Sequence, residues 1–236
     1  MIDEIFDLHW QMSTCEKFSL IRSLEILKPE VAIEVGTYRG GSLQVISRFA
    51  SEVVSIDIDP GVSERLSGLF GNVRFLSGDS SHLLSQTLQS YAGSDKKVSF
   101  VLIDGDHSTE GVKRDVKALL EWKPEADCVV LFHDAFNPAC REGIRTAGWE
   151  KSPYVHSVEL DYVPGIYHEH AYDTAQARSM WGWFARAVLR PTPRSGGLEI
   201  LASQRGFFNA VYSVSSHKPS SLMQRVKRKL IRGVSF

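Results

Sequence analysis

The chain has 236 residues, of which 43% are hydrophobic and 23% are charged, and this length fits one domain with a sizeable core better than two. The formal net charge of -1 excludes a strongly basic protein, so composition gives no support for nucleic-acid binding. Cys15, Cys128 and Cys140 lack the CxxC spacing of zinc or redox sites and favour a reducing, cytoplasmic compartment. The N-terminus is acidic where a signal peptide is basic, and no apolar run approaches the roughly 18 residues of a membrane span.

The first predicted element is a helix that begins near Ser13 and ends near Lys28. Ser13 and Glu16 have capping-box spacing, and apolar residues follow them at helical intervals. Pro29 stops the helix because it cannot continue the hydrogen-bond pattern. We expect this helix to cover one face of a sheet.

Five short apolar runs then alternate with longer amphipathic segments. Each run is typical of a buried parallel strand, and the runs cover residues 31–35, 53–57, 73–76, 98–103 and 128–132. The segments between them have helical length and cover residues 43–49, 63–70, 80–91 and 109–122. Five βα units of this kind predict a doubly wound sheet, in which ligands bind beyond the carboxyl ends of the strands.

The regular alternation ends after Ala147. We expect a sixth strand at 154–160 and a seventh at 209–215, with 198–202 competing for one of these places. The predicted fold is a Rossmann-like, mostly parallel seven-stranded sheet with helices on both faces. Between the last strands lies an aromatic-rich stretch, which we interpret as an insertion at about 161–206 that caps the active site; a subdomain packed for stability alone is the alternative. The domain would span 1–217, followed by a basic tail at 218–236.

Polar residues stand at the ends of the first strands. Glu34 and Gly36 open a loop whose glycines let the backbone turn tightly and approach a ligand. Asp57 follows Gly36 at about the 20-residue spacing of a ribose-binding acid in dinucleotide folds. The phosphate-cradling GxGxxG pattern is absent, and Glu34 would repel a pyrophosphate but suit a cation. The loop therefore favours a sulfonium nucleoside over NAD.

In these segments the chain resembles class I methyltransferases, specifically the catechol O-methyltransferase-like branch and the family called methyltransferase domain 24. The resemblance covers roughly residues 15 to 135 and rests on four motifs in the same order, chiefly 103–115 (IDGDHSTEGVKRD). It implies S-adenosylmethionine as the cofactor, with its methionine part near Glu34 and Gly36, its ribose at Asp57 and its adenine beside 78–80. The implied cofactor-binding residues are Glu34, Gly36, Thr37, Tyr38, Gly40, Ser42, Asp57, Asp79, Ser80 and Asp104. For Asp57 and Asp79, helix capping is the alternative role.

The resemblance also implies a divalent metal site. Asp104 and Asp134, at the ends of the fourth and fifth strands, match carboxylates that hold a hard cation such as Mg²⁺ or another divalent metal. The catechol pattern places asparagine after the second acid, and this chain has Ala135 there. His133 is either a compensating ligand or a packed structural residue.

His107 is the predicted general base. It stands three residues after Asp104, where the catechol-like enzymes carry a catalytic lysine. A histidine with an ordinary pKa near 6.5 can take a hydroxyl proton at neutral pH. The alternative is that His107 caps the following helix or bonds the backbone.

Two further segments have patterns typical of metal binding or of membrane contact. The run 167–170 (YHEH) contains an HxH pattern, but nothing aims it, so we expect a solvated loop rather than a metal site. The tail combines basic residues with an apolar helical face, which would suit peripheral contact with the inner face of the membrane; a frayed or docked helix is the alternative.

The sequence thus predicts an O-methyltransferase that acts on a hydroxyl of a small molecule such as a sugar or a phenol. Asp104 and His107 are the predicted catalytic residues. The competing hypotheses are a degenerate methyltransferase fold that serves as a binding or scaffold module, and an NAD-dependent oxidoreductase, against which the missing GxGxxG counts. The identity of the acceptor and the oligomeric state, a homo-oligomer included, stay open.

Overall fold

The computed structural model describes residues 7–165, 167–169, 178–180 and 182–214. The chain divides into two compact units, residues 1–203 and residues 204–236. The first unit contains every strand of the described residues and the helices up to 151. Within this described part, no helix is both long enough and apolar enough to cross a membrane.

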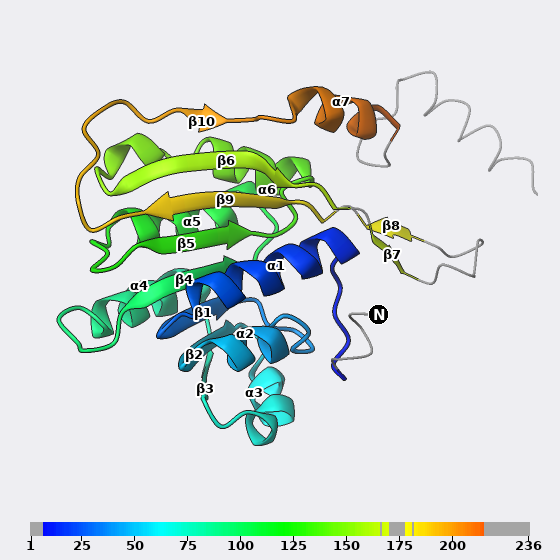
Figure 1. Cartoon of the computed structure of the whole chain (residues 1–236). Helices are drawn as coiled ribbons and strands as arrows, with labels where there is room; N and C mark the ends of the chain where they lie inside the picture. Colours follow the sequence, from blue (N-terminus) through cyan, green and yellow to red (C-terminus); the bar gives the residue numbers. More distant parts are fainter. Residues whose placement is uncertain (1–6, 166, 170–177, 181, 215–236) are drawn as a thin grey trace, which may run out of the picture. The chain divides into compact units, whose positions relative to one another are not determined.

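The first unit is built on one large, mostly parallel sheet (Figure 1). Its strands run in the order β10-β6-β9-β5-β4-β1-β2-β3, and β9 is antiparallel to both of its neighbours. The strand order reverses between β1 and β4, where doubly wound sheets bind their ligands. The strands are β1 (Val31–Val35), β2 (Glu52–Asp57), β3 (Val73–Ser77), β4 (Val98–Ile103), β5 (Cys128–Phe132), β6 (Val155–Val163), β9 (Phe184–Leu189) and β10 (Ile200–Leu201).

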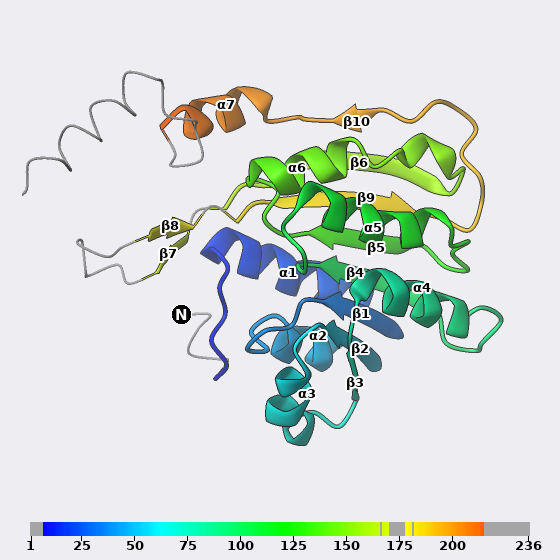
Figure 2. The same ribbon diagram turned by 180° about the vertical axis from the view of Figure 1, so that it is seen from behind.

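Helices cover both faces of this sheet (Figures 1 and 2). On one face lie α1 (Thr14–Leu27) and α2 (Leu43–Phe49), and on the other lie α4 (Ser80–Ser90), α5 (Thr109–Leu120) and α6 (Pro138–Arg145). Near the β3 edge are α3 (Pro60–Leu66) and the 3-10 helix η2 (Ser67–Leu69); η3 (Trp149–Lys151) follows α6. The predicted Rossmann-like fold is confirmed, with eight strands in the large sheet rather than seven.

The capping box predicted for the first helix is confirmed. The Ser13 side chain accepts a hydrogen bond from the Glu16 amide, and the Glu16 carboxylate accepts one from the Ser13 amide. Lys28 closes the helix in a left-handed conformation, directly before Pro29. Leu20 and Leu24 are fully buried, which places the apolar face of α1 against the sheet.

The strand predicted at 209–215 is wrong, because 205–214 form the helix α7 (Arg205–Val214) of the second unit. Phe208 and Tyr212 stack on each other, as residues four apart on a helix do. The competing segment at 198–202 supplies β10, and the sequence interpretation missed β9, whose residues were assigned to the capping insertion.

The stretch interpreted as an insertion has two parts. From Trp183 onward it belongs to the core, since Trp183 and Phe184 are fully buried. Before that, β7 (Tyr167–Glu169) and β8 (Arg178–Met180) pair as a small antiparallel sheet, so the solvated loop expected at 167–169 is a strand. His170, Tyr172, Trp181 and the basic tail lie outside the described residues.

Candidate active site

A cavity of about 570 Å³ opens at the carboxyl ends of the central strands. This volume lies within the range of small-molecule binding sites. Its wall combines the loops after β1, β2, β3, β4 and β5 with the segment that precedes α1. The lining residues include Gly36, Thr37, Tyr38, Ser42, Asp57, Asp79, Ser80, Asp104, His107, His133 and Asp134. Most of the residues predicted for the cofactor therefore meet in one cavity.

The loop after β1 is held in a shape that requires glycine. Gly36 has a φ of 82°, and a Cβ there would lie 2.1 Å from the carbonyl oxygen of Asp104. The Asp57 carboxylate accepts hydrogen bonds from the amides of Thr37 and Tyr38, at 2.8 and 2.9 Å. Asp57 therefore ties the loop to the end of β2, and its oxygens keep lone pairs for a ligand.

Glu34 lies beneath this loop. Its carboxylate is fully buried and accepts hydrogen bonds from the Ser42 hydroxyl at 2.5 Å and the Thr37 hydroxyl at 2.8 Å. Burial raises the pKa of Glu34 to about 7, although both hydroxyls oppose the shift. Glu34 is not among the residues that line the cavity, whereas its partners are. Its visible role is to fix the loop.

The third strand ends in a helix cap that also faces the cavity. Asp79 caps α4 by accepting hydrogen bonds from the amide and the hydroxyl of Ser81, which lower the pKa of Asp79. The capping alternative thus holds for Asp79, although the residue lines the cavity as well. Asp57 caps no helix; Asp59 caps α3. Behind Asp79, the Ser80 hydroxyl donates to the buried Asp115 at 2.7 Å.

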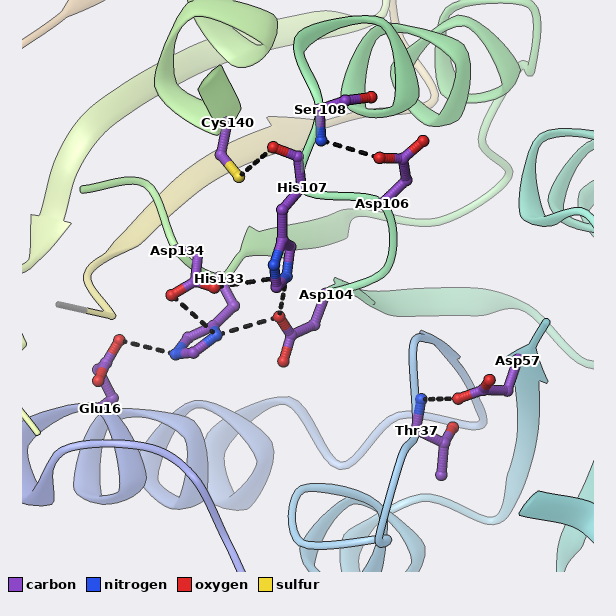
Figure 3. Close-up of polar contacts among 10 residues, drawn as sticks. All are labelled: Glu16, Thr37, Asp57, Asp104, Asp106, His107, Ser108, His133, Asp134 and Cys140. Carbon is purple, nitrogen blue, oxygen red and sulfur yellow. Dashed lines mark hydrogen bonds and ion pairs between the residues drawn. The ribbon is translucent and has the colours of Figure 1, made fainter. Parts of the chain in front are cut away.

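Two histidines and three carboxylates gather where β4 and β5 end (Figure 3). His107 Nε2 lies 3.4 Å from both Asp104 Oδ1 and Asp134 Oδ2. His133 Nδ1 lies 3.1 Å from Asp104 Oδ1 and 3.7 Å from Asp134 Oδ1. On its other side, His133 Nε2 lies 3.2 Å from Glu16 Oε1. The His107 side chain is 47% exposed and His133 is 8% exposed, so His107 is the accessible one.

The charges of this cluster depend on one another. Burial opposes the charge of Asp104, but His133 and His107 outweigh it and lower the Asp104 pKa to about 2. Burial and the Asp104 charge raise the pKa of Asp134, against the effect of His133. The hydrogen bond with Asp104 raises the pKa of His107, and the Asp134 charge adds to this. Burial lowers the pKa of His133, but the surrounding carboxylates raise it well above 6.5.

One group of side chains in the described residues can converge on a metal ion. Asp104, His133 and Asp134 each offer a ligand atom, and these atoms lie within 4.8 Å of one another. Ala135, at the position of the expected asparagine, is fully buried, and its amide donates to the Trp183 carbonyl at 2.9 Å. His133 is therefore the third member of this group, and the Ala135 side chain offers no ligand atom.

His107 does not cap the following helix. The cap of α5 is Ser108, whose side chain accepts a hydrogen bond from the Gly111 amide. The His107 carbonyl instead accepts a contact from the buried Cys140 thiol at 3.5 Å. Its ring is thus left to face Asp104 and Asp134.

Sequence reasoning missed two contributors to the site. Residues 9–12 line the cavity, and the chain before them is anchored by reciprocal hydrogen bonds between the Leu8 backbone and the Gln44 side chain, at 3.0 and 2.8 Å. No sequence signal marked this segment. Glu16 was found as a helix cap, but its contact with His133 follows from the tertiary fold.

The fold shares its sheet reversal, the cavity beside it, the glycine loop after β1 and the acids at the ends of β2 and β4 with class I methyltransferases. Residues 33–135 match the model of a family described as a methyltransferase domain, so this part of the chain resembles methyltransferases. No curated protein matches the chain in sequence.

Solved structures agree on the fold. An O-methyltransferase from Bacillus cereus, crystallised with S-adenosylhomocysteine, is 16% identical over 75% of this chain and 82% of its own, with a TM-score of 0.50. The YcgJ protein from Bacillus subtilis is 11% identical over 73% of this chain and 97% of its own, also with a TM-score of 0.50. At such identities the likeness concerns the fold alone.

Proposed function

We propose that the protein is an O-methyltransferase that moves the methyl group of S-adenosylmethionine to a hydroxyl of a small molecule such as a sugar or a phenol. The observation that carries this proposal is the position of His107. It lines the cavity, is half exposed and lies 3.4 Å from two carboxylates that can stabilise its protonated form. A hydroxyl must lose its proton as it is methylated, so a placed base suits an oxygen acceptor.

The cofactor would lie along the carboxyl ends of the strands. We assign its methionine part to the loop at Gly36–Ser42, including Thr37, Tyr38 and Gly40, with Glu34 holding that loop from below. Its ribose hydroxyls would bond Asp57, and its adenine would lie beside Asp79 and Ser80. In this placement the sulfonium lies toward Asp104, whose carboxylate favours the positive charge.

The proposed reaction is a single displacement. The acceptor oxygen attacks the methyl carbon, and the carbon–sulfur bond breaks with its electron pair moving to sulfur, which leaves neutral S-adenosylhomocysteine. The hydroxyl proton passes to His107 Nε2, and the imidazolium is then stabilised by Asp104 and Asp134. Much of the acceleration would come from holding oxygen, methyl and sulfur in line.

A divalent cation fits this arrangement. Asp104 and Asp134 would hold it, and its chemistry would be to acidify the acceptor hydroxyl. The reaction above assigns its proton to His107 in either case.

The test needs no knowledge of the acceptor. Purified protein is titrated with S-adenosylhomocysteine and S-adenosylmethionine by calorimetry, and Asp57→Ala is titrated beside it. Asp127→Ala, on an exposed acid outside the cavity lining, is the control. We expect micromolar binding that Asp57→Ala weakens about tenfold or more, because one good polar contact to a ligand contributes over 1 kcal/mol. Absence of binding by folded protein would favour the scaffold hypothesis.

A positive titration leads to an acceptor screen that measures S-adenosylhomocysteine formation. Sugars and phenols are compared with primary amines of similar size. Turnover confined to amines would contradict the O-methyltransferase proposal.

A further inference from the structure

Glu16 is a fully buried carboxylate whose two oxygens have different partners (Figure 3). Oε2 accepts the Ser13 amide at 2.8 Å and completes the capping box of α1. Oε1 lies 3.2 Å from Nε2 of His133 at the end of β5. The cap fixes the plane of the carboxylate, so the second oxygen is held against the histidine ring.

Two glycines leave room for this carboxylate. A Cβ at Gly165 would lie 2.4 Å from Glu16 Cδ, and a Cβ at Gly182 would lie 2.3 Å from Glu16 Oε1. Real Cβ atoms do not approach other atoms so closely, so a side chain at either position would displace Glu16. The chain before β7 and the chain after β8 therefore both pack on this carboxylate.

The carboxylate of Glu16 favours a proton on the ring nitrogen of His133 that lies beside it. His133 Nδ1 hydrogen-bonds Asp104 Oδ1 at 3.1 Å, while Nε2 and Glu16 Oε1 lie 3.2 Å apart without hydrogen-bond geometry. A cation between Asp104 and Asp134 would take the place of the Nδ1 proton, and the Glu16 carboxylate would then favour the remaining proton on Nε2. Donors about 2.1 Å from one ion lie about 3.0 Å apart in octahedral and about 3.4 Å apart in tetrahedral coordination. Of the observed distances from Nδ1, 3.1 Å lies between these two values and 3.7 Å is slightly longer than the tetrahedral one.

We propose that Asp104, Asp134 and His133 Nδ1 form a site for a divalent transition-metal cation such as Mn²⁺ or Zn²⁺, and that Glu16 is the positioning residue that orients His133 as the third ligand. This inference rests on the proposed function, because the ion would lie beside the reacting hydroxyl. An imidazole ligand favours transition metals, whereas Mg²⁺ prefers oxygen ligands and retained waters. His133 thus replaces the oxygen that Ala135 cannot offer.

Glutamine at position 16 separates the two roles of Glu16. A capping box accepts Gln as well as Glu, so Glu16→Gln preserves the start of α1. The amide oxygen must face the Ser13 N–H, which turns the NH₂ group toward His133 Nε2. That group donates to Nε2 and moves the ring proton to Nδ1, where the metal has to bind. We therefore expect Glu16→Gln to weaken metal binding about 10–100-fold.

The experiment uses the full chain after treatment with a chelator. Mn²⁺, Zn²⁺ and Mg²⁺ are each titrated alone by calorimetry, and bound Mn²⁺ is counted by electron paramagnetic resonance. We expect one Mn²⁺ per chain and at least about tenfold tighter binding of Mn²⁺ and Zn²⁺ than of Mg²⁺. The matched control is Glu25→Gln, on the exposed face of the same helix, which should leave these affinities unchanged.

Nuclear magnetic resonance of the ¹⁵N-labelled histidine rings provides a second readout that does not depend on activity. In metal-loaded wild-type protein His133 should carry its proton on Nε2, and Glu16→Gln should move it to Nδ1. If Glu16→Gln fails to fold, His133→Asn takes its place and should remove the preference for Mn²⁺ and Zn²⁺ over Mg²⁺.

The outcomes that would overturn the site are distinct from failure of the proposed function. Wild-type protein that binds S-adenosylhomocysteine but neither Mn²⁺ nor Zn²⁺ has no such site, and metal binding that survives Asp134→Asn reflects an adventitious ion only. Unchanged metal affinity in Glu16→Gln removes Glu16 from the site. Metal binding without any S-adenosylhomocysteine binding would contradict the proposed function instead.

Discussion

Replacing Asp115 by asparagine should stabilise the protein at neutral pH. Asp115 lies on α5 and is 1% exposed. Its Oδ1 accepts the Ser80 hydroxyl, while Oδ2 is buried with no hydrogen-bond partner in the described part of the chain. Burial raises the pKa of Asp115 from 3.8 to about 6, and the Ser80 bond opposes that shift. Holding this carboxylate charged therefore costs stability.

The magnitude follows from the shift of about two pKa units at about 1.4 kcal/mol each, which amounts to about 3 kcal/mol at pH 7. The folded state holds the Asp115 proton more tightly than the unfolded state, so the stability penalty grows as the proton is lost. The penalty is therefore absent below pH 3.8, grows as the pH rises, and is complete above pH 6. At pH 4.5 it is about 1 kcal/mol.

Urea denaturation of wild-type protein and Asp115→Asn at pH 7 and at pH 4.5 measures this effect. The stability gained by asparagine should be about 2 kcal/mol larger at pH 7. This difference between two pH values is insensitive to how well asparagine packs, since packing contributes equally at both. Asp127→Asn, on an exposed carboxylate, is the control variant and is measured at the same two pH values. An equal gain for Asp115→Asn at both pH values would refute the reasoning.

Three further variants probe the site and its support. Gly36→Ala places a Cβ 2.1 Å from the Asp104 carbonyl at a left-handed φ, so it should cost about 3 kcal/mol in denaturation and weaken S-adenosylhomocysteine binding in calorimetry; unchanged binding would contradict the loop assignment. His107→Asn should lower kcat about 10²–10⁴-fold and leave the cofactor affinity unchanged. In wild-type protein kcat/KM should rise with pH through a midpoint above 6.5, because the hydrogen bond with Asp104 raises the His107 pKa. Full turnover by His107→Asn would place the base elsewhere. Arg141→Met removes the 2.8 Å ion pair with the buried Asp161 and should destabilise the protein by up to about 3–5 kcal/mol in denaturation. A loss below about 1 kcal/mol would show that this ion pair is dispensable.

The first five strands could be predicted from sequence because each is a continuous apolar run between turn signals, as buried parallel strands are. The pairing of β9 could not be predicted from the sequence. Its residues follow an aromatic-rich segment, and β9 enters the sheet between β5 and β6, where Ala187 pairs with Val130 and with Val158. That insertion depends on partners far away in the chain, which local periodicity does not record.

The candidate site, like the sheet, could be predicted from the sequence only in part. Asp57, Asp104 and Asp134 could be placed together because the carboxyl ends of parallel strands meet at one edge of a sheet. The capping box identified Glu16 from four residues of sequence, yet its second oxygen lies beside His133, which follows β5 more than a hundred residues later. The capping rule explains the glutamate at position 16, and the tertiary fold explains its contact with His133.

The charges of the site also suggest how the protein distinguishes the two forms of its cofactor. The Asp104 carboxylate, with a pKa of about 2, is ionised at any physiological pH. In the proposed placement it faces the sulfonium of S-adenosylmethionine, and methyl transfer removes that positive charge from the ligand. Because the attraction between opposite charges is then lost, the same carboxylate that favours binding of the methyl donor no longer retains the product. A fixed anion at the end of β4 would thus favour binding of the methyl donor over retention of the product.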